Sequence, residues 1–339
     1  MKAAVYLGPN HLEVQELPIP DVGDNQVLVK VAYCGICGTD VHIYHGDGGA
    51  ADVNPPLIIG HEFSGTVCKI GKNVTKLKVG DAVSVNPNDM CGECWYCHNG
   101  MEHFCEHFTG IGTTVNGGFA EYCVASESTV YKVGDLDLMA AAMVEPLSCC
   151  LHGIDLCGIR PGDAVMVIGT GPIGLIVLQL AKNCGATVVA TARSPQKKEL
   201  AMSLGADIVI DPNTEDVPAV LAERGLRLNC VIECVGSPKT IGQAIDWAGK
   251  GATIMLFGLT GPDAEITVKP DVIFKKELKI TSSFINPYTY GRSVELLRAG
   301  KVDVKTMIRN VISLEGLEDA LATDKLRKQG KVVVKLAND

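Results

Sequence analysis

The chain has 339 residues, a length that favours two domains. Its formal net charge of −9 at pH 7 argues against nucleic acid or an anionic membrane surface as a partner. The opening residues Met1-Lys2-Ala3-Ala4 lead into an alternating pattern rather than an apolar core, so no signal peptide is predicted. The fourteen cysteines therefore indicate reduced thiols and metal ligands in a cytoplasmic protein, rather than disulfides.

The first 35 residues predict short strands and turns. Leu12, Val14 and Glu16 alternate with other side chains, and residues 26–32 (QVLVKVA) form a stronger alternating strand. Strand character returns at residues 117–133. We expect no helix in the first 35 residues, so the chain begins as a β-rich domain.

Two short motifs in this region carry reactive side chains. Cys34 and Cys37 have the spacing of a redox pair, but no thioredoxin-like βαβ pattern surrounds them, so we favour a functional Cys37 and a packing role for Cys34. Gly60-His61-Glu62 follows a proline-rich turn and an apolar run. A lone His-Glu pair is usually an ordinary surface feature, and it becomes a candidate site only when other motifs with reactive side chains accompany it.

Four cysteines lie within fifteen residues, at positions Cys91, Cys94, Cys97 and Cys105. This spacing matches a closed zinc site with four thiolates; the alternatives are an iron–sulfur cluster or unligated thiols. No position is left for water, so the site is predicted to be structural. The nearby histidines, His98, His103 and His107, are interpreted as bystanders.

A helix-like run over residues 137–150 contains Glu145-Pro146-Leu147-Ser148. A glutamate before proline is unexpected in such an apolar stretch. It is either a functional carboxylate or a surface carboxylate at a helix terminus.

The centre of the chain, residues 164–181, predicts the first half of a βαβ unit. An apolar strand over 164–168 leads into G-x-G-x-x-G, with Gly169, Gly171 and Gly174 in the three places, and a helix follows. These glycines allow a tight turn, close approach of a pyrophosphate, and close packing of helix and strand. Eighteen uncharged residues are long enough to span a membrane, but two glycines and a proline at the middle argue against that reading.

From residue 162 onward strands and helices alternate, as expected for a doubly wound parallel sheet. The predicted strands are 164–168, 187–192, 207–210, 229–235, 252–257 and 278–283, and the predicted helices are 173–184, 195–204, 216–224 and 238–249. Residues 288–339 do not continue this rhythm. They predict helices over 288–299 and 315–322 and a strand over 332–334, which we expect to return to the N-terminal domain.

In this order, the motifs resemble the zinc-dependent medium-chain dehydrogenase/reductase family over essentially the whole chain. Within it, they look most like the polyol (sorbitol or ketose reductase) and threonine dehydrogenase branches. The resemblance implies an α/β protein: a GroES-like β-rich catalytic domain over residues 1–148, a Rossmann dinucleotide-binding domain over 149–286, and a C-terminal return over 287–339.

By this resemblance Cys37 and His61 bind a catalytic zinc, so that two zinc ions per chain are expected. Glu62 matches the family's adjacent carboxylate, either as a ligand or as an exchanging one. Where alcohol dehydrogenases of the family usually have a cysteine as third ligand, this chain has Glu145, bound directly or through water. That departure points to the polyol and threonine branches.

The resemblance also implies a path for the substrate proton. Thr39 would accept it from the substrate oxygen, and His42 would relay it toward solvent. The alternatives are a role of Thr39 in turn formation and an ordinary surface histidine at position 42.

The second strand of the βαβ unit predicts the choice of cofactor. NAD enzymes place an acid roughly 20 residues after the glycines, where it binds the ribose 2′-hydroxyl. Here Ala192 occupies that place, and Arg193, Ser194 and Lys197 follow, so NADP(H) is expected over NAD(H). The resemblance further implies cofactor contacts from Pro172, Ile173, Leu259 and Phe284.

These patterns predict a zinc- and nicotinamide-dependent dehydrogenase of a secondary alcohol, most consistent with a polyol/ketose pair. A threonine-type dehydrogenase is the alternative enzyme, and a non-catalytic zinc-binding module is the alternative from another class. We expect a small-molecule alcohol or ketone as substrate, no nucleic-acid or membrane partner, and a homo-oligomer, tetramer or dimer.

Overall fold

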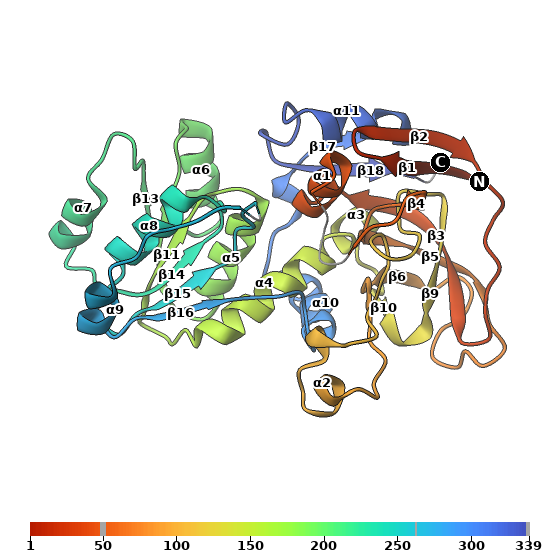
Figure 1. Cartoon of the computed structure of the whole chain (residues 1–339), viewed down its shortest axis with the longest axis horizontal. Helices are drawn as coiled ribbons and strands as arrows, with labels where there is room; N and C mark the ends of the chain where they lie inside the picture. Colours follow the sequence, from red (N-terminus) through yellow and green to blue (C-terminus); the bar gives the residue numbers. More distant parts are fainter. Residues whose placement is uncertain (48–51, 262, 337–339) are drawn as a thin grey trace. The chain divides into compact units, whose positions relative to one another are not determined.

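The structure is a computed structural model that describes residues 1–47, 52–261 and 263–336. The chain divides into two compact units, one of Met1–Ser148 with Pro287–Asp339 and one of Cys149–Asn286. The first unit combines the two ends of the chain, and the second is formed by its middle (Figure 1).

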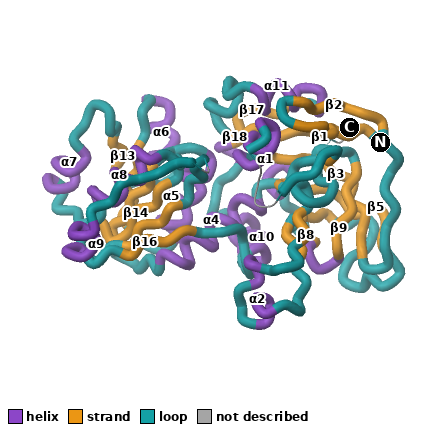
Figure 2. Tube along the Cα trace, in the orientation of Figure 1, coloured by secondary structure: helices purple, strands orange, loops and turns teal. Residues whose placement is uncertain are grey.

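The first unit is rich in β-structure (Figure 2). Its main sheet has the order β10-β6-β5-β3-β18-β17, with β9 also paired to β3, and a three-stranded sheet has the order β2-β1-β4. The strands are β1 Lys2–Gly8, β2 His11–Glu16, β3 Gln26–Gly35, β4 Leu57–Ile58, β5 Glu62–Ile70, β6 Ala82–Val85, β7 Asn88–Asp89, β8 Thr109–Gly110, β9 Tyr122–Ser126, β10 Val130–Lys132, β17 Ile308–Ile312 and β18 Lys331–Lys335.

The long strand β3 organises this unit. Its alternating sequence is buried at Val27, Val29 and Val31, and these side chains belong to a core that includes Phe63 and Phe119. β3 pairs antiparallel with β5, so that Gly35 lies opposite Glu62, and antiparallel with β18, so that Gly35 lies opposite Val333. Strand β18, near the C-terminus, therefore lies beside β3.

The helices of the first unit are short. They are α1 Gly38–His45, α2 Trp95–His98, α3 Leu138–Ala141, α10 Tyr290–Arg298 and α11 Leu317–Ala322, and α4 Val144–Cys157 begins in this unit. The predicted helix over 137–150 is corrected here, because the chain forms two helices with a break at 142–143 and the second runs on to Cys157. Strand β17 was not predicted.

The second unit is a six-stranded parallel sheet with the order β13-β12-β11-β14-β15-β16. The strands are β11 Ala164–Ile168, β12 Thr187–Thr191, β13 Ile208–Ile210, β14 Leu228–Glu233, β15 Thr253–Leu256 and β16 Lys279–Ser282. Every residue of β11 is buried, as expected for a central parallel strand covered on both faces. The predicted doubly wound fold is confirmed.

Helices α5 Pro172–Asn183, α6 Pro195–Ser203, α7 Val217–Glu223, α8 Pro238–Trp247 and α9 Pro270–Lys276 connect these strands. Each begins with a proline in its first turn, where the missing N–H costs nothing. The predicted bounds are correct to within two residues, and α9 was not predicted. Residues 164–183 form a strand, a turn and a twelve-residue helix, and no described helix is long and apolar enough to cross a bilayer.

Candidate functional site

Cys37, His61 and Glu62 lie together in the first unit. One ligand atom from each falls within 4.8 Å of the others. Cys37 ends the turn after β3 and is the N-cap of α1, while His61 and Glu62 stand at the start of β5, which pairs with β3. The pairing of β3 with β5 therefore brings the two motifs together. A thiol, an imidazole and a carboxylate form a donor set that fits zinc and leaves one tetrahedral position free.

Asp40 supports two of these residues. Its Oδ2 accepts the backbone N–H of Cys37 at 2.7 Å, and its Oδ1 lies 3.3 Å from Nδ1 of His61. Asp40 is fully buried. Among the described residues, no other group forms a hydrogen bond with Oδ1 of Asp40 or with Nδ1 of His61. The contact leaves Nε2 as the imidazole nitrogen available to a metal, as is usual for a histidine ligand backed by a carboxylate.

The electrostatics of this group are dominated by buried charge. Burial opposes a charge on His61, but Asp40 and Cys37 outweigh it and raise the pKa of His61 well above its usual value. Burial also opposes the charge of Lys331, and the carboxylate of Glu62 outweighs it and raises the pKa of that lysine. Lys331 donates a hydrogen bond to Oε2 of Glu62. A metal bound by Glu62 would therefore share this carboxylate with the ammonium group of Lys331.

Cys34, the first cysteine of that pair, packs in the core as predicted. Cys34 is fully buried in the core of the first unit, and burial raises the pKa of its thiol well above the usual value. It is absent from the group formed by Cys37, His61 and Glu62.

Glu145 stands in the first turn of α4 and is 6% exposed. The interpretation as a surface carboxylate is therefore wrong. Its carboxylate is nevertheless outside the group of Cys37, His61 and Glu62. The geometry favours Glu62 over Glu145 as a direct partner of the other two residues.

Thr39 and His42 both lie on α1, which starts at the Cys37 cap. The Cys37 thiol lies 3.7 Å from Oγ1 of Thr39, so the hydroxyl is next to the donor set. His42 lies one turn later, its side chain is 32% exposed, and its Nδ1 is 3.4 Å from Asp47. The helix thus places a hydroxyl beside the site and an imidazole nearer the surface.

The four cysteines Cys91, Cys94, Cys97 and Cys105 form a second group. Their sulfur atoms are 3.4 Å (Cys91 to Cys105), 3.6 Å (Cys94 to Cys97) and 4.0 Å (Cys91 to Cys97) apart. Four ligands about 2.3 Å from a central zinc have sulfur–sulfur distances of about 3.8 Å. The group therefore has the size of a tetrahedral zinc site, and its sulfurs are too far apart for disulfides.

Backbone amides turn toward these sulfurs. Cys91 Sγ receives the N–H groups of Glu93 and Cys94, and Cys105 Sγ receives those of Cys91 and His107. Backbone N–H groups also lower the pKa of Cys94 to about 6, whereas burial and the Cys94 sulfur raise the pKa of Cys97 to about 12. The site thus stabilises a thiolate, which is the form that binds zinc. His98, His103 and His107 are outside the group.

The glycine motif of the second unit has the predicted geometry. Gly169 has φ +99°, a value that favours glycine, and its N–H donates to the Thr191 hydroxyl at 3.0 Å. A Cβ on Gly174 would overlap the carbonyl oxygen of Gly169, whereas a Cβ on Gly171 would meet nothing within 4 Å. The turn thus leaves open space at Gly171, beside the N-terminus of α5, where a phosphate would approach.

The residues expected around the rest of a cofactor lie in loops that follow strands of the sheet. Ala192 is buried just after β12 and Arg193 is exposed; the Ser194 hydroxyl caps α6 by accepting the Lys197 N–H at 3.4 Å. Pro172 and Ile173 begin α5. Leu259 and Phe284 follow β15 and β16 and are 66% and 41% exposed. All these loops lie at the carboxyl edge of the sheet, where ligands bind in this type of fold.

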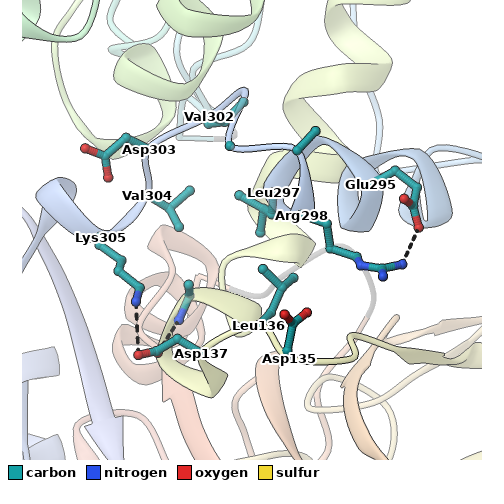
Figure 3. Close-up of a pocket in the computed structure, with 13 residues that line it drawn as sticks. Asp135, Leu136, Asp137, Glu295, Leu297, Arg298, Val302, Asp303, Val304 and Lys305 are labelled. Carbon is teal, nitrogen blue, oxygen red and sulfur yellow. Dashed lines mark hydrogen bonds and ion pairs between the residues drawn. The ribbon is translucent and has the colours of Figure 1, made fainter.

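A pocket of about 820 Å³ lies elsewhere in the first unit, between the start of α3 and the end of α10 (Figure 3). Leu297, Val302 and Val304 are buried along it. Two ion pairs occupy its rim: Lys305 with Asp137 (3.1 Å) and Arg298 with Glu295 (3.2 Å). None of the residues that line it belongs to either donor set.

Comparison with known proteins agrees with this geometry. The alcohol dehydrogenase GroES-like domain matches residues 23–135, and the zinc-binding dehydrogenase domain matches residues 172–299. D-arabinitol dehydrogenase 1 of Uromyces fabae is 35% identical over 99% of this chain and 97% of its own length. The chain belongs to the zinc-dependent medium-chain dehydrogenase/reductase family. It is a zinc-dependent oxidoreductase that acts on alcohols.

Other members of the family are about equally similar. L-threonine 3-dehydrogenase of Symbiobacterium thermophilum is 36% identical over 95% of this chain and 93% of its own length. A structure described as a zinc-binding dehydrogenase of Sinorhizobium meliloti 1021, bound to NADP, has a TM-score of 0.94 at 35% identity and covers 98% of both chains. Both branches that the sequence resembles are thus represented among these dehydrogenases.

Sequence reasoning missed three buried charged residues. Asp40 and Lys331 contact the first donor set, and Glu233 ends β14 beside the glycine motif. Asp40 had a local signal, because it lies three residues after Cys37 at the start of a helix, where a carboxylate can accept the N–H of the cap residue.

Proposed function

We propose that this medium-chain dehydrogenase oxidises a secondary alcohol of a polyol, or reduces the matching ketose, with NADP(H) as its cofactor. The observation that carries the proposal is the group formed by partly buried Cys37 with buried His61 and Glu62, in which a carboxylate is the third donor. Cys37, His61 and Glu62 would hold a catalytic zinc, and the four cysteines from 91 to 105 a structural zinc, giving two ions per chain. Glu145 would act from outside the group.

Bound zinc supplies a Lewis acid at the substrate oxygen, and the bound nicotinamide exchanges the hydride. The chain's own residues then hold and move the proton. Thr39 would accept it from the substrate hydroxyl, since its Oγ1 lies beside Cys37. His42, one turn along α1 and partly exposed, would pass it to solvent. Asp40 would keep the His61 imidazole oriented throughout.

On the cofactor side, Gly169, Gly171, Gly174, Pro172 and Ile173 would surround the pyrophosphate at the start of α5. The buried Ala192 leaves room for a 2′-phosphate, and the exposed Arg193, with Ser194 and Lys197, would bind it. Leu259 and Phe284 would contact the nicotinamide half.

We further propose that the protein works in the cytoplasm as a homodimer or homotetramer. All fourteen cysteines are free, which suits a reducing compartment. The edge strand β16 carries Ile280, 40% exposed, and α9 just before it carries Phe274, 85% exposed. Size-exclusion chromatography with light scattering tests the assembly, and a monomer would contradict it.

The deciding experiment is a panel of polyols, diols and L-threonine, assayed with NADP⁺ and NAD⁺ in wild type and Cys37→Ser. We expect the highest kcat/KM with a polyol and NADP⁺, and no turnover by the variant although its far-UV circular dichroism is unchanged. Preference for L-threonine would assign the enzyme to the threonine branch. A folded, zinc-loaded protein that turns over no secondary alcohol would support the non-catalytic alternative.

A further inference from the structure

Residues 110–119, which we call the connecting loop, link the surroundings of the two proposed metal sites. The loop begins at the end of β8, which pairs antiparallel with β7. The four cysteines lie between β7 and β8 in the sequence, so a metal that joins their sulfurs also fixes the start of the loop. Its other end lies beside residues 58–60, which lead directly to His61.

The start of the connecting loop is a tight turn around Gly110. The N–H groups of Thr114 and Val115 donate to the carbonyl of Gly110 at 2.8 and 3.1 Å, and the Gly110 N–H donates to the Thr114 hydroxyl at 2.8 Å. The N–H of Ile111 donates to the carbonyl of Pro87, just before β7, at 2.8 Å. The turn is therefore bonded to both strands at the base of the cysteine group, and its position follows theirs.

The end of the connecting loop is bonded to the backbone that precedes His61. Three of its N–H groups donate to three neighbouring carbonyls: Gly117 to Ile58 at 2.7 Å, Gly118 to Gly60 at 2.7 Å and Phe119 to Ile59 at 3.1 Å. The side-chain oxygen of Asn116 accepts the N–H of Ile58 at 3.1 Å. The loop thus holds the segment before His61 along its whole length.

The packing at Gly60 leaves no room for the loop to shift independently. A Cβ on either Gly112 or Gly117 would overlap the carbonyl oxygen of Gly60, and a Cβ on Gly60 would overlap the ring of Phe119. A displaced loop would therefore move the backbone of Gly60, and with it the next residue, His61. Losing a group that orients a metal ligand typically weakens metal binding, by about ten- to a hundredfold.

We propose that the connecting loop couples the two metal sites, so that zinc held by the four cysteines raises the zinc affinity of the site formed by Cys37, His61 and Glu62. The inference rests on the proposed assignment of two zinc ions to this chain. With the cysteine site filled, the loop is fixed at both ends and holds His61 in its binding position. With that site empty, the loop has to be ordered when the other zinc binds, which weakens the binding. The coupling is reciprocal, and the loop residues are positioning residues that ligate neither metal.

The first test measures the loop directly by amide hydrogen exchange. Cys37→Ser leaves the four cysteines as the proposed zinc site, and its metal-stripped form is compared with the form that has bound one equivalent of zinc. We expect zinc to slow exchange of the Gly117, Gly118 and Phe119 amides by about tenfold, within the usual range of coupling between sites. The amides of α11, in the same unit, are the control and should change much less.

The second test compares two glycine variants. Gly112 and Gly80 have φ values of +81° and +94°, so alanine strains the backbone at both, but a Cβ on Gly80 would meet nothing within 4 Å. Zinc titration with a competing chelator should show affinity lowered about tenfold in Gly112→Ala, at the site whose binding step Cys37→Ser abolishes. Gly80→Ala should bind as wild type does. If Gly112→Ala does not fold, Asn116→Ala replaces it and should weaken binding about two- to tenfold, the effect of one hydrogen bond.

The third test asks whether both effects pass through the same loop. Cys94→Ser, which removes a ligand of the cysteine site, should also lower affinity at the Cys37 site about tenfold. Combined with Gly112→Ala, its effect should be smaller than in wild type, because the loop has already lost its position. If Cys94→Ser does not fold, hydrogen exchange in Cys37→Ser and titration of the loop variants decide the matter.

Three results would overturn the inference: loop amides that zinc protects no more than those of α11, wild-type zinc affinity in the folded loop variant, or effects of Cys94→Ser and Gly112→Ala that simply add. These results are distinguishable from failure of the proposed function. If Cys37→Ser still bound two zinc ions, the catalytic site would be misassigned. If it bound one while the loop amides and the loop variant were unaffected, only the coupling would fall.

Discussion

The carboxylate of Asp40 lies 3.3 Å from Nδ1 of His61 and, through its other oxygen, accepts the backbone N–H of Cys37 at 2.7 Å. One fully buried side chain therefore orients two of the three residues of the proposed catalytic site. Because it also raises the pKa of His61, it supplies charge as well as orientation.

Asp40→Asn should weaken zinc binding at this site by about ten- to a hundredfold, the usual effect of losing a residue that orients a metal ligand. The amide has nearly the same shape, so the fold should survive. Zinc titration of the metal-stripped protein, with competition by a chelator, measures the change. Asp24→Asn, at the exposed ion pair with Lys72, is the control. Wild-type affinity in Asp40→Asn would show that the contact with His61 does not serve the metal.

Cys94→Ser should remove the other zinc ion and lower the stability of the protein. Structural zinc contributes folding free energy directly, and a loss of about 3 kcal/mol corresponds to a drop in Tm of about 10 °C. Cys68→Ser changes a cysteine outside both donor groups and should leave zinc content unchanged. A Cys94→Ser protein with two zinc ions and wild-type Tm would contradict a structural site.

Local patterns predicted most of this molecule. The glycine motif, the prolines that begin helices and the four clustered cysteines each act over a few residues, so their structural consequences can be read from neighbouring positions. Gly174 is a clear example, since the residue that excludes its side chain is Gly169, five positions earlier.

The features that were missed depend on contacts between distant parts of the chain. Lys331 and Glu62 are separated by 269 residues, and only the pairing of β18, β3 and β5 brings them together. Burial of Glu145 likewise depends on how α4 packs, so its sequence neighbours could not distinguish a buried from a surface carboxylate. The break between α3 and α4 falls in an apolar run, and its one local signal is Pro146, a proline in the first turn of α4.

Glu233 connects two loops at the carboxyl edge of the parallel sheet. Its fully buried carboxylate accepts the N–H groups of Val235 (2.8 Å) and Gly236 (3.0 Å), and its carbonyl accepts those of Phe257 and Gly258 (both 2.9 Å). Glu233→Gln keeps the size but replaces one acceptor with a donor that faces these amides. We expect NADPH affinity, measured by fluorescence, to fall about tenfold, as for the loss of a charge-assisted bond.

The control for this variant is Glu223→Gln at the end of α7, and the two proteins should differ much less in Tm than in NADPH affinity. Equal NADPH affinity in Glu233→Gln and wild type would restrict Glu233 to a structural role.

Asp207 makes stability depend on pH. Burial raises its pKa, but the ammonium of Lys182 at 2.6 Å and the N–H of Val188 at 2.7 Å outweigh this and lower the pKa of Asp207 below its usual value. A lowered folded-state pKa stabilises the protein above the unfolded pKa of about 3.9, and this contribution is lost as pH falls through the folded value.

At pH 7, Asp207→Asn should therefore lower the free energy of unfolding by about 0.5–1 kcal/mol, a small effect because both side chains are partly exposed and solvent screens them. The difference from wild type should shrink below about pH 4 and vanish at lower pH. Urea unfolding at pH 7 and pH 3 measures it. An equal difference at both pH values would mean that the charge of Asp207 contributes nothing.

Ala192 and Arg193 should determine the cofactor preference. NAD enzymes of this fold place an acid at the end of the second strand, where it binds the ribose 2′-hydroxyl and repels a 2′-phosphate. Here Ala192 is buried and Arg193 is exposed directly after β12, with Lys197 in the first turn of α6. A guanidinium can bind a phosphate through two hydrogen bonds, and a charge-assisted contact contributes about 1.5–3 kcal/mol, or about ten- to a hundredfold in affinity.

We therefore expect kcat/KM to favour NADP(H) by that factor in wild type and to shift toward NAD(H) in Ala192→Asp/Arg193→Leu. Lys198→Gln changes the next lysine of α6, whose ion-pair partner Glu215 lies before α7, and should leave the ratio unchanged. A wild type that prefers NAD(H), or a double variant whose ratio does not move, would show that Arg193 is only a solvated charge at the end of the strand.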